Sequence, residues 1–148
     1  YETMKHAVAY AETGHLCIST LHANNANQAI DRIINFFPEP AHKQLYKDLE
    51  LNLLAVISLR LIPAKDGGRV PAVEIMLKTP YISELISRGD IDSLKDAIEQ
   101  GEHDGMQTFD QSLYKLCKEG KITEEMAMEY ADSRSNLGMK FRFGGDPA

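Results

Sequence analysis

The segment from Gly14 to Asn25 constrains the fold more than any other part of this sequence. It reads Gly-His-Leu-Cys-Ile-Ser-Thr-Leu-His-Ala-Asn-Asn, an apolar run that a glycine precedes and small polar residues follow. Residues 2–13 carry apolar side chains at helical spacing, and Gly14 suits the left-handed position that ends a helix. A nearly unbroken apolar run, His15–Leu21, is typical of a parallel strand buried on both faces. The pattern therefore predicts an α/β fold.

Two helices are predicted after this strand. Asn24 or Asn25 can cap a helix that contains Ile30 and ends before Phe37-Pro38, because proline disfavours a helical residue in front of it. A longer helix is predicted from about Pro40, because apolar residues recur at steps of three and four and form one buried stripe. The residues of this stripe are Leu45, Leu49, Leu53, Val56 and Ile57.

A β-hairpin is predicted next. The segments 59–64 and 69–77 are apolar and flank Asp66-Gly67-Gly68, a typical hairpin turn. Pro63 and Pro71 have no N–H to donate, so both strands are expected at the edge of a sheet.

The rest of the chain is predicted to be helical as far as Ala131. Thr79-Pro80 combines a cap with a proline at the first helical position, and Thr108 to Gln111 forms a capping box. The later residues are charged and show no period, which predicts a mobile tail. The expected helices span 80–88, 92–100, 108–119 and 123–131. The expected domains are 1–78, 79–131 and the tail 132–148.

The composition indicates a globular protein and argues against some partners. Of 148 residues 43% are apolar, and the net charge is −6, which disfavours nucleic acid and anionic membranes because both attract basic surfaces. The most apolar run, 51–64, is too short to cross a bilayer, and the amino terminus shows no signal-peptide pattern. Cys17 and Cys117 lie in apolar patterns and are predicted to be reduced core residues of a cytosolic protein.

The histidines do not predict a metal site. His15 and His22 are seven residues apart, so on one strand they face opposite sides and lie roughly 23 Å from each other. His6, His42 and His103 have no cysteine or carboxylate at ligand spacing. We therefore predict that no metal ion is bound by these residues.

His22 is the candidate ligand-binding residue. It follows the predicted strand, and ligands of open α/β sheets bind outside the carboxyl ends of the strands. An imidazole there can donate a hydrogen bond to an anionic oxygen, or it can simply cap the next helix. Thr20 is either a polar sensor at the same edge or a satisfied buried threonine. No Gly-x-Ser-x-Gly elbow occurs, so hydrolysis by a serine triad is not supported.

Several blocks of the chain resemble the secretion-type ATPases, the hexameric RecA-like motors of type IV pili and type II secretion. Ala11-Glu12-Thr13-Gly14-His15-Leu16 and Ser19-Thr20-Leu21-His22-Ala23 resemble their His box. The pattern is most similar to the pilus retraction ATPases, the PilT and PilU group, and within it to PilU-like members. The other blocks that carry the resemblance are Ile30–Ile34, Ala55–Ser58, Asp66–Val70, Glu74–Met76 and Gly105–Asp110.

Two features separate the chain from related motors. Assembly ATPases of the PilB and GspE type carry a four-cysteine zinc insertion, whereas this chain has two cysteines, so the resemblance favours retraction. Retraction ATPases of the PilT type usually have Ala-Ile-Arg after the proline, but Thr79-Pro80 leads here into Tyr81-Ile82-Ser83. This departure suits an accessory, PilU-like motor.

The resemblance also implies roles for residues. His22 is expected next to the γ-phosphate of ATP, with Thr20 as a possible sensor. Arg60 either contacts nucleotide or a neighbouring subunit, or is simply solvated at the sheet edge. Glu12, Gly14 and His15 are expected to support the start of the strand. Glu74 alternates with apolar neighbours and is predicted to face away from the core, toward an interface.

The resemblance implies a fragment of a larger machine. No Gly-x-x-x-x-Gly-Lys-Ser/Thr occurs in the chain, so the phosphate-binding loop and the Walker B strand are expected upstream of Tyr1. The chain is then the C-terminal part of a RecA-like core followed by a helical region, and it is inactive alone, with no tightly bound cofactor. The whole protein is expected to use ATP and Mg²⁺ as a cytoplasmic homo-hexamer at the inner membrane, without inserting into it. Its expected partners are a second retraction ATPase and the pilus platform protein.

One alternative of another class stays open. The chain could be a non-catalytic interaction or oligomerisation module that docks on a pilus motor or platform protein. Nucleotide binding by the chain and by the full-length protein separates the two readings.

Overall fold

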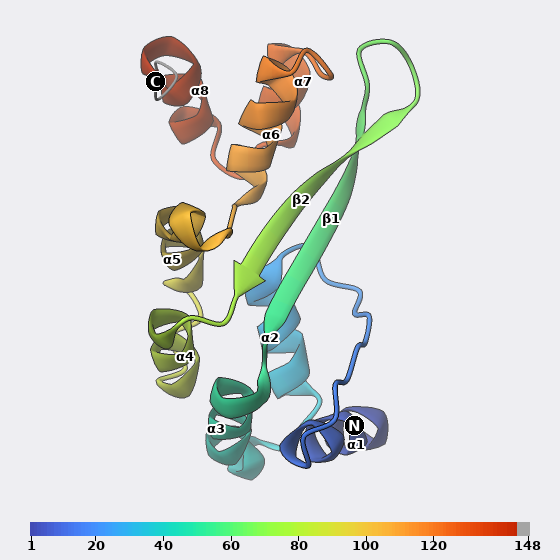
Figure 1. Ribbon diagram of the computed structural model, residues 1–148, viewed down its shortest axis with the longest axis vertical. Coiled ribbons are helices and arrows are strands. Elements are labelled where there is room, and N and C mark those ends of the chain that lie inside the picture. Colours follow the sequence, from blue (N-terminus) through green and yellow to red (C-terminus); the bar gives the residue numbers. More distant parts are fainter. Residues whose placement is uncertain (145–148) are drawn as a thin grey trace.

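A long β-hairpin runs through the molecule and has helices packed along it. The structure is a computed structural model that describes residues 1–144. The helices are α1 (Glu2–Glu12), α2 (Ala26–Asn35), η1 (Glu39–Ala41), α3 (His42–Asn52), α4 (Pro80–Ser87), α5 (Leu94–Gln100), η2 (Gly101–Asp104), α6 (Phe109–Lys118), α7 (Glu124–Tyr130) and α8 (Arg134–Phe143). Figure 1 shows an elongated molecule, with α6, α7 and α8 near the turn of the hairpin and α1 and α3 near its opposite end.

The hairpin consists of β1 (Ala55–Pro63) and β2 (Arg69–Leu77), paired antiparallel from Ala55 opposite Leu77 to Pro63 opposite Arg69. Gly67 and Gly68 have φ angles of 92° and 75°, a conformation that only glycine adopts readily, which confirms the predicted turn. Among the described residues, β2 also forms one bridge outside the hairpin, between Ile75 and Gln107.

The boundary between α3 and β1 differs from the prediction. The helix ends at Asn52, and the strand begins at Ala55 rather than at residue 59. Val56 and Ile57 continue the apolar spacing of the helix, but they are β-branched and pair with Met76 and Ile75 of β2. Periodicity over so few residues does not separate helix from strand, and cross-strand pairing decides it.

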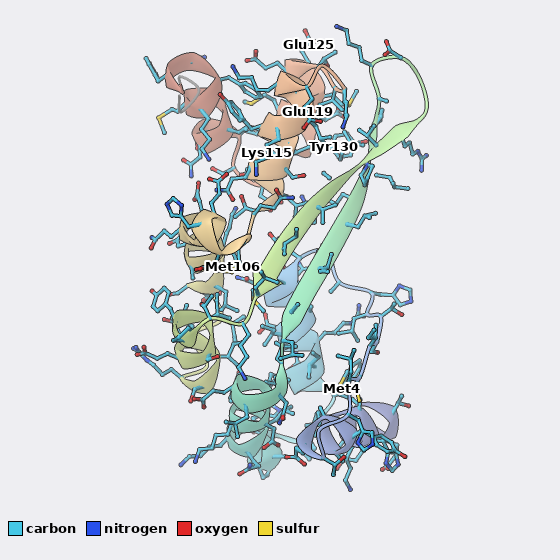
Figure 2. All side chains as sticks on the ribbon, in the orientation of Figure 1. Met4, Met106, Lys115, Glu119, Glu125 and Tyr130 are labelled. Atoms are coloured by element: carbon cyan, nitrogen blue, oxygen red, sulfur yellow. The ribbon has the colours of Figure 1, made fainter. Side chains whose placement is uncertain are left out.

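The apolar side chains form two cores that the hairpin connects. The first core lies around the lower half of the hairpin in Figure 1. The second core lies between the upper half of the hairpin and the helices α6, α7 and α8. Met106, in the first core, lies between α5 and β2 (Figure 2). The first core contains Ala26, Ile30, Ile33, Ile34, Leu45, Leu49, Met76, Ile82, Leu85, Ile86, Ile91, Leu94, Ala97, Ile98 and Met106. The second core contains Ile62, Ala72, Phe109, Leu113, Leu116, Ile122, Ala127 and Leu137.

The caps of the helices follow the local sequence. The side chains of Asn25 and Thr79 accept hydrogen bonds from Gln28 N and Ile82 N, as predicted. Thr108 and Gln111 form the predicted capping box at the start of α6.

The mobile tail predicted for residues 132–148 is wrong over residues 134–143. They form α8, whose Leu137 is fully buried in the second core, and Ser133 accepts a hydrogen bond from Asn136 N at its start. Leu137 and the partly buried Phe141 are the residues of this segment that pack on that core, too few to stand out among charged neighbours, so the composition suggested disorder. Residues 145–148 lie outside the described part of the chain.

The strand predicted at His15–Leu21 is not formed. Residues 15–23 are neither helix nor strand, and Leu16 and Ile18 are 76% and 87% exposed. A strand needs a neighbour for its N–H and C=O groups, and in the described residues β1 and β2 pair with each other instead. Cys17 on this segment is exposed and is not the core residue that the apolar pattern predicted, whereas Cys117 is half-buried and packs against the second core.

No helix within the described residues is both long and apolar enough to cross a bilayer.

Candidate functional site

The segment that carries His22 is held in place by α2. Arg32 Nη1 donates to the carbonyl oxygen of His22. Asn24 N donates to Gln28 Oε1 at 3.2 Å, and Gln28 N donates to Asn25 Oδ1 at 2.9 Å. These contacts fix the carbonyl group of His22 and the backbone that follows it, and they leave the residue itself exposed.

His22 lines a shallow pocket of about 230 Å³ on the outer surface of α2. The other lining residues are Ala23, Gln28, Asp31, Arg32 and Asn35. The pocket holds one arginine and one aspartate, together with amide groups that can donate or accept. This surface can bind a small polar group, and the imidazole and guanidinium supply donors for an anionic oxygen.

The residues expected to support His22 lie at the end of α1. Glu12 is the last residue of the helix, and Gly14 follows it with a φ of 85°. His15 N donates to Tyr10 O at 3.1 Å, the His15 ring packs edge-on against Tyr10 at 6.0 Å, and His15 Nδ1 lies 3.0 Å from Thr13 Oγ1. These contacts hold His15 against the helix end, although the residue is exposed.

Thr20 lies on the same irregular segment, two residues before His22, and is exposed. The structure therefore does not bury it as a satisfied core threonine, and its role as a sensor stays a prediction.

Glu74 is a buried residue, which contradicts the prediction that it faces away from the core. Only 3% of it is exposed, and Glu74 Oε1 accepts a hydrogen bond of 2.8 Å from Ala26 N at the start of α2. Burial raises the pKa of the Glu74 carboxyl above its ordinary value, and the nearby Asp132 carboxylate acts in the same direction. The hydrogen bond from Ala26 and the charges of Arg60 and Lys95 lower the pKa, but they do not outweigh burial.

Arg60 is part of a half-buried cluster with Phe109 and Asp132, which differs from the solvated edge residue considered above. Its guanidinium carbon lies 3.8 Å from the centre of the Phe109 ring, and Nη1 lies 2.7 Å from Asp132 Oδ1. Its side chain is 23% exposed. Asp132 and Phe109 are therefore site residues that the sequence analysis missed.

The structure does not bring the five histidines together. In residues 1–144 no group of three or more His, Cys, Asp or Glu side chains has the arrangement of a metal site. His42 is engaged elsewhere, with Nε2 2.9 Å from the carbonyl oxygen of Phe37.

The His22 segment, α2 and β1–β2 all lie in one stretch that matches a known protein family. Residues 1–79 match the model of the type II/IV secretion system proteins. The chain belongs to this family. The match covers the segments that carry His22, Arg60 and Glu74.

Members of the type II/IV secretion system family resemble the chain over nearly its full length. It is 50% identical over 146 residues to the type IV pilus ATPase PilU of Pseudomonas aeruginosa, which covers 98% of this chain and 38% of that protein. It is 41% identical over 136 residues to the type IV pilus retraction ATPase PilT of the same organism, covering 92% of this chain and 40% of that protein. The chain thus spans about two fifths of the length of these relatives. These matches confirm the resemblance to the PilT and PilU group.

Solved structures support the fold. The crystal structure of the pilus retraction motor PilT with bound ADP matches with a TM-score of 0.81 and 38% identity, over 93% of this chain and 38% of that one. The ATPase DotB of Legionella pneumophila matches with a TM-score of 0.72 at 21% identity, over 85% of this chain and 34% of that one, which indicates a shared fold. The predicted fold class, part of a RecA-like ATPase with a helical C-terminal region, is confirmed, although the parallel strand at His15–Leu21 is not formed.

The buried carboxyl of Glu74 predicts a pH-dependent stability. Between pH 4.5 and its raised pKa, the folded protein holds a proton that the unfolded chain has lost, so stability falls as the pH rises through this window. Glu74→Gln keeps an acceptor for Ala26 N and removes the titration. We expect the stability of the variant relative to the parent to rise from pH 4 toward neutral pH and then level off.

Urea denaturation of both proteins at a series of pH values measures this difference. The control is Glu84→Gln, because Glu84 forms an ion pair with Arg88 in which its side chain is 61% exposed. This control should follow the parent at every pH. A difference between Glu74→Gln and the parent that does not change with pH would contradict the prediction.

Proposed function

We propose that the chain is part of a hexameric motor ATPase that couples ATP hydrolysis to retraction of type IV pili, and that it acts as a PilU-like accessory motor. The observation that carries the proposal is the 50% identity to PilU over 98% of the chain, compared with 41% to PilT. Thr79-Pro80-Tyr81-Ile82 supports the accessory role, because the Ala-Ile-Arg expected of autonomous retraction motors is missing at this place.

His22 is the residue that touches the nucleotide in this proposal. It is exposed, its backbone is fixed by Arg32, and it lines a pocket with hydrogen-bond donors. Its imidazole donates to a γ-phosphate oxygen, where hydrogen bonds strengthen as charge develops. The bound ADP of the PilT structure supports a nucleotide as the ligand. ATP with Mg²⁺ is the cofactor of the full-length protein, and the protein works in the cytoplasm against the inner-membrane pilus platform, beside a second retraction ATPase.

Motility separates an accessory motor from an autonomous one. The full-length protein should restore twitching in a strain that lacks its own gene but keeps a PilT-type motor. It should not restore twitching in a strain that lacks both motors. Full twitching in the strain without a PilT-type motor would contradict the accessory role.

A second candidate function is an interaction module without catalysis. Exposed apolar side chains on β1 favour it, since Ile57, Leu59 and Leu61 are 68%, 60% and 50% exposed and alternate along one face of the strand. Tight nucleotide binding by the full-length protein supports the motor, and its absence supports the module.

A protein made of these 148 residues alone is expected to show no ATP turnover. It contains no Gly-x-x-x-x-Gly-Lys-Ser/Thr, so it has neither the lysine and backbone N–H groups that hold the β- and γ-phosphates nor the hydroxyl that holds Mg²⁺. Phosphate release by the purified chain is the measurement, with the His22→Ala chain as the control for contaminating ATPases. Turnover that the His22→Ala chain lacks would contradict this expectation.

A further inference from the structure

Arg60 lies at the junction between the two cores. It belongs to β1, the strand that runs from the first core to the second. Its guanidinium lies over the ring of Phe109, which is fully buried in the second core, at 3.8 Å. This stacking fixes the plane of the guanidinium, and its two terminal nitrogens point to fixed positions.

The two nitrogens donate to segments that are far apart in the sequence. Arg60 Nη2 donates to the carbonyl oxygen of Asn24 at 3.4 Å, two residues after His22. Arg60 Nη1 donates to Asp132 Oδ1 at 2.7 Å and, at 3.5 Å, to the carbonyl oxygen of Tyr130, which lies beside the upper half of the hairpin (Figure 2). One planar group therefore connects the His22 segment with the link between α7 and α8.

Asp132, which accepts from Arg60, is itself held in place by other residues. The carboxylate of Asp110 accepts hydrogen bonds from Asp132 N at 2.8 Å and from Ser133 N at 3.0 Å. Lys95 Nζ of α5 lies 4.0 Å from Asp132 Oδ2. Asp132 thus moves with α6, through Asp110, and with the start of α8.

The His22 side of the junction is equally constrained. Ala26 N, two residues after Asn24, donates to the buried Glu74 Oε1, and Arg32 Nη1 contacts the carbonyl oxygen of His22. Asn24 lies between these two contacts, so the hydrogen bond from Arg60 acts on the backbone that joins His22 to the start of α2.

We propose that Arg60 is a positioning residue that couples the helices α6, α7 and α8 to the His22 segment. When the link between α7 and α8 shifts, Asp132 turns the guanidinium on Phe109, and the guanidinium displaces Asn24. The role of His22 at a nucleotide rests on the proposed function, but the coupling itself concerns only contacts within this chain. Arginine is required because a lysine has a single nitrogen that cannot donate to Asn24 and Asp132 from a stacked position.

Hydrogen exchange in the full-length protein tests the coupling without any activity assay. The reporter is the segment 22–29, measured by mass spectrometry, because the amide of Ala26 in it is buried and hydrogen-bonded. Asp132→Ala is expected to speed exchange in 22–29 by roughly fivefold, as the loss of a partly buried ion pair does. Asp132 is far from this segment in sequence, and Arg60 connects the two.

The double variant gives the decisive comparison. Arg60→Ala should speed exchange in 22–29 to a similar extent, and adding Asp132→Ala to it should change nothing further. If Asp132→Ala alters exchange only around residues 130–137, the coupling is wrong. It is also wrong if exchange in 22–29 of the double variant is faster than in Arg60→Ala by the factor that Asp132→Ala causes alone. If Arg60→Ala does not assemble, Arg60→Lys takes its place. Exchange in 22–29 of Arg60→Lys should then be as fast as in Asp132→Ala. Full protection in Arg60→Lys overturns the proposal.

A matched control and an activity measurement complete the test. Arg88→Ala removes an arginine from an exposed ion pair with Glu84, in which the Arg88 side chain is 65% exposed, and it should leave exchange in 22–29 unchanged. If His22 acts on ATP, Arg60→Lys should lower kcat several-fold and leave KM close to that of the parent. Suppose that Asp132→Ala speeds exchange in 22–29 as expected, but His22→Ala keeps full ATPase activity. This result would refute the nucleotide role of His22 and still support the coupling.

Discussion

His22→Ala in the full-length protein is expected to reduce ATP turnover by about 10²–10³-fold, or ~3–4 kcal/mol in the barrier. In the proposed function the imidazole donates to an oxygen on which charge builds up in the transition state, so its loss should act on kcat. ATP affinity should change little, because the proposed function assigns most contacts to the bound nucleotide to a phosphate-binding loop upstream of Tyr1, as expected from the resemblance. The melting temperature should also change little, since His22 is exposed and its carbonyl group, which Arg32 contacts, is retained.

His15→Ala is the matched control for this variant. His15 is a second histidine of the same exposed segment, but its contacts are with Tyr10 and Thr13 at the end of α1. We expect a small loss of stability and a smaller loss of turnover. Steady-state kinetics and thermal denaturation of both variants give the comparison. If His22→Ala hydrolyses ATP near the parental rate, His22 does not touch the γ-phosphate, and the fixed backbone of residues 22–25 serves only to start α2.

Elements whose signals are local could be predicted from the sequence. Asn25, Thr79 and Thr108 bond to backbone groups three residues away, so their capping roles depend on neighbours in the chain. Gly67 and Gly68 adopt positive φ angles that other residues avoid. For these positions the chemistry of the residue is nearly sufficient to define the structure.

Elements that depend on distant partners could not be predicted in this way. Residues 15–21 have the composition of a buried strand, but a strand forms only where another strand offers its backbone groups. The alternation along β2 separates two faces without showing which one is covered, and the start of α2 covers the face of Glu74. Leu137 is the buried residue of α8, and Phe141 packs beside it at the edge of the second core, so two apolar side chains in a charged segment gave too short a pattern to reveal the helix.

The candidate site was predictable only in part, for the same reason. His22 was proposed from its place after an apolar run and from the resemblance, and its role stays a prediction. The partners of Arg60 lie 36 to 72 residues away in the chain, and no spacing in the sequence connects them. A single arginine on an edge strand is compatible with solvent, a ligand or a neighbour, and only the folded chain shows Phe109 and Asp132 beside it.

Phe109→Ala is expected to lower the free energy of unfolding by about 3–5 kcal/mol. Phe109 is fully buried in the second core, so the substitution removes apolar contacts and leaves a cavity among Ile62, Leu113 and their neighbours. It also removes the ring on which the Arg60 guanidinium lies, so the ion pair with Asp132 loses its support. For a chain of this size the melting temperature should fall by roughly 6–20 °C.

Thermal and urea denaturation of the purified 148-residue chain measure the effect of Phe109→Ala, with Phe143→Ala as the matched control. Phe143 ends α8 and is 81% exposed, so its truncation should change the free energy of unfolding by no more than about 0.5 kcal/mol. Phe109→Leu should fall between the two, because leucine fills part of the space but offers no aromatic face to Arg60. A loss in Phe109→Ala as small as that in Phe143→Ala would mean that the second core is not packed around Phe109. Faster exchange in residues 22–29 of Phe109→Leu, beyond what its lower stability explains, would show that the ring itself holds Arg60 in position.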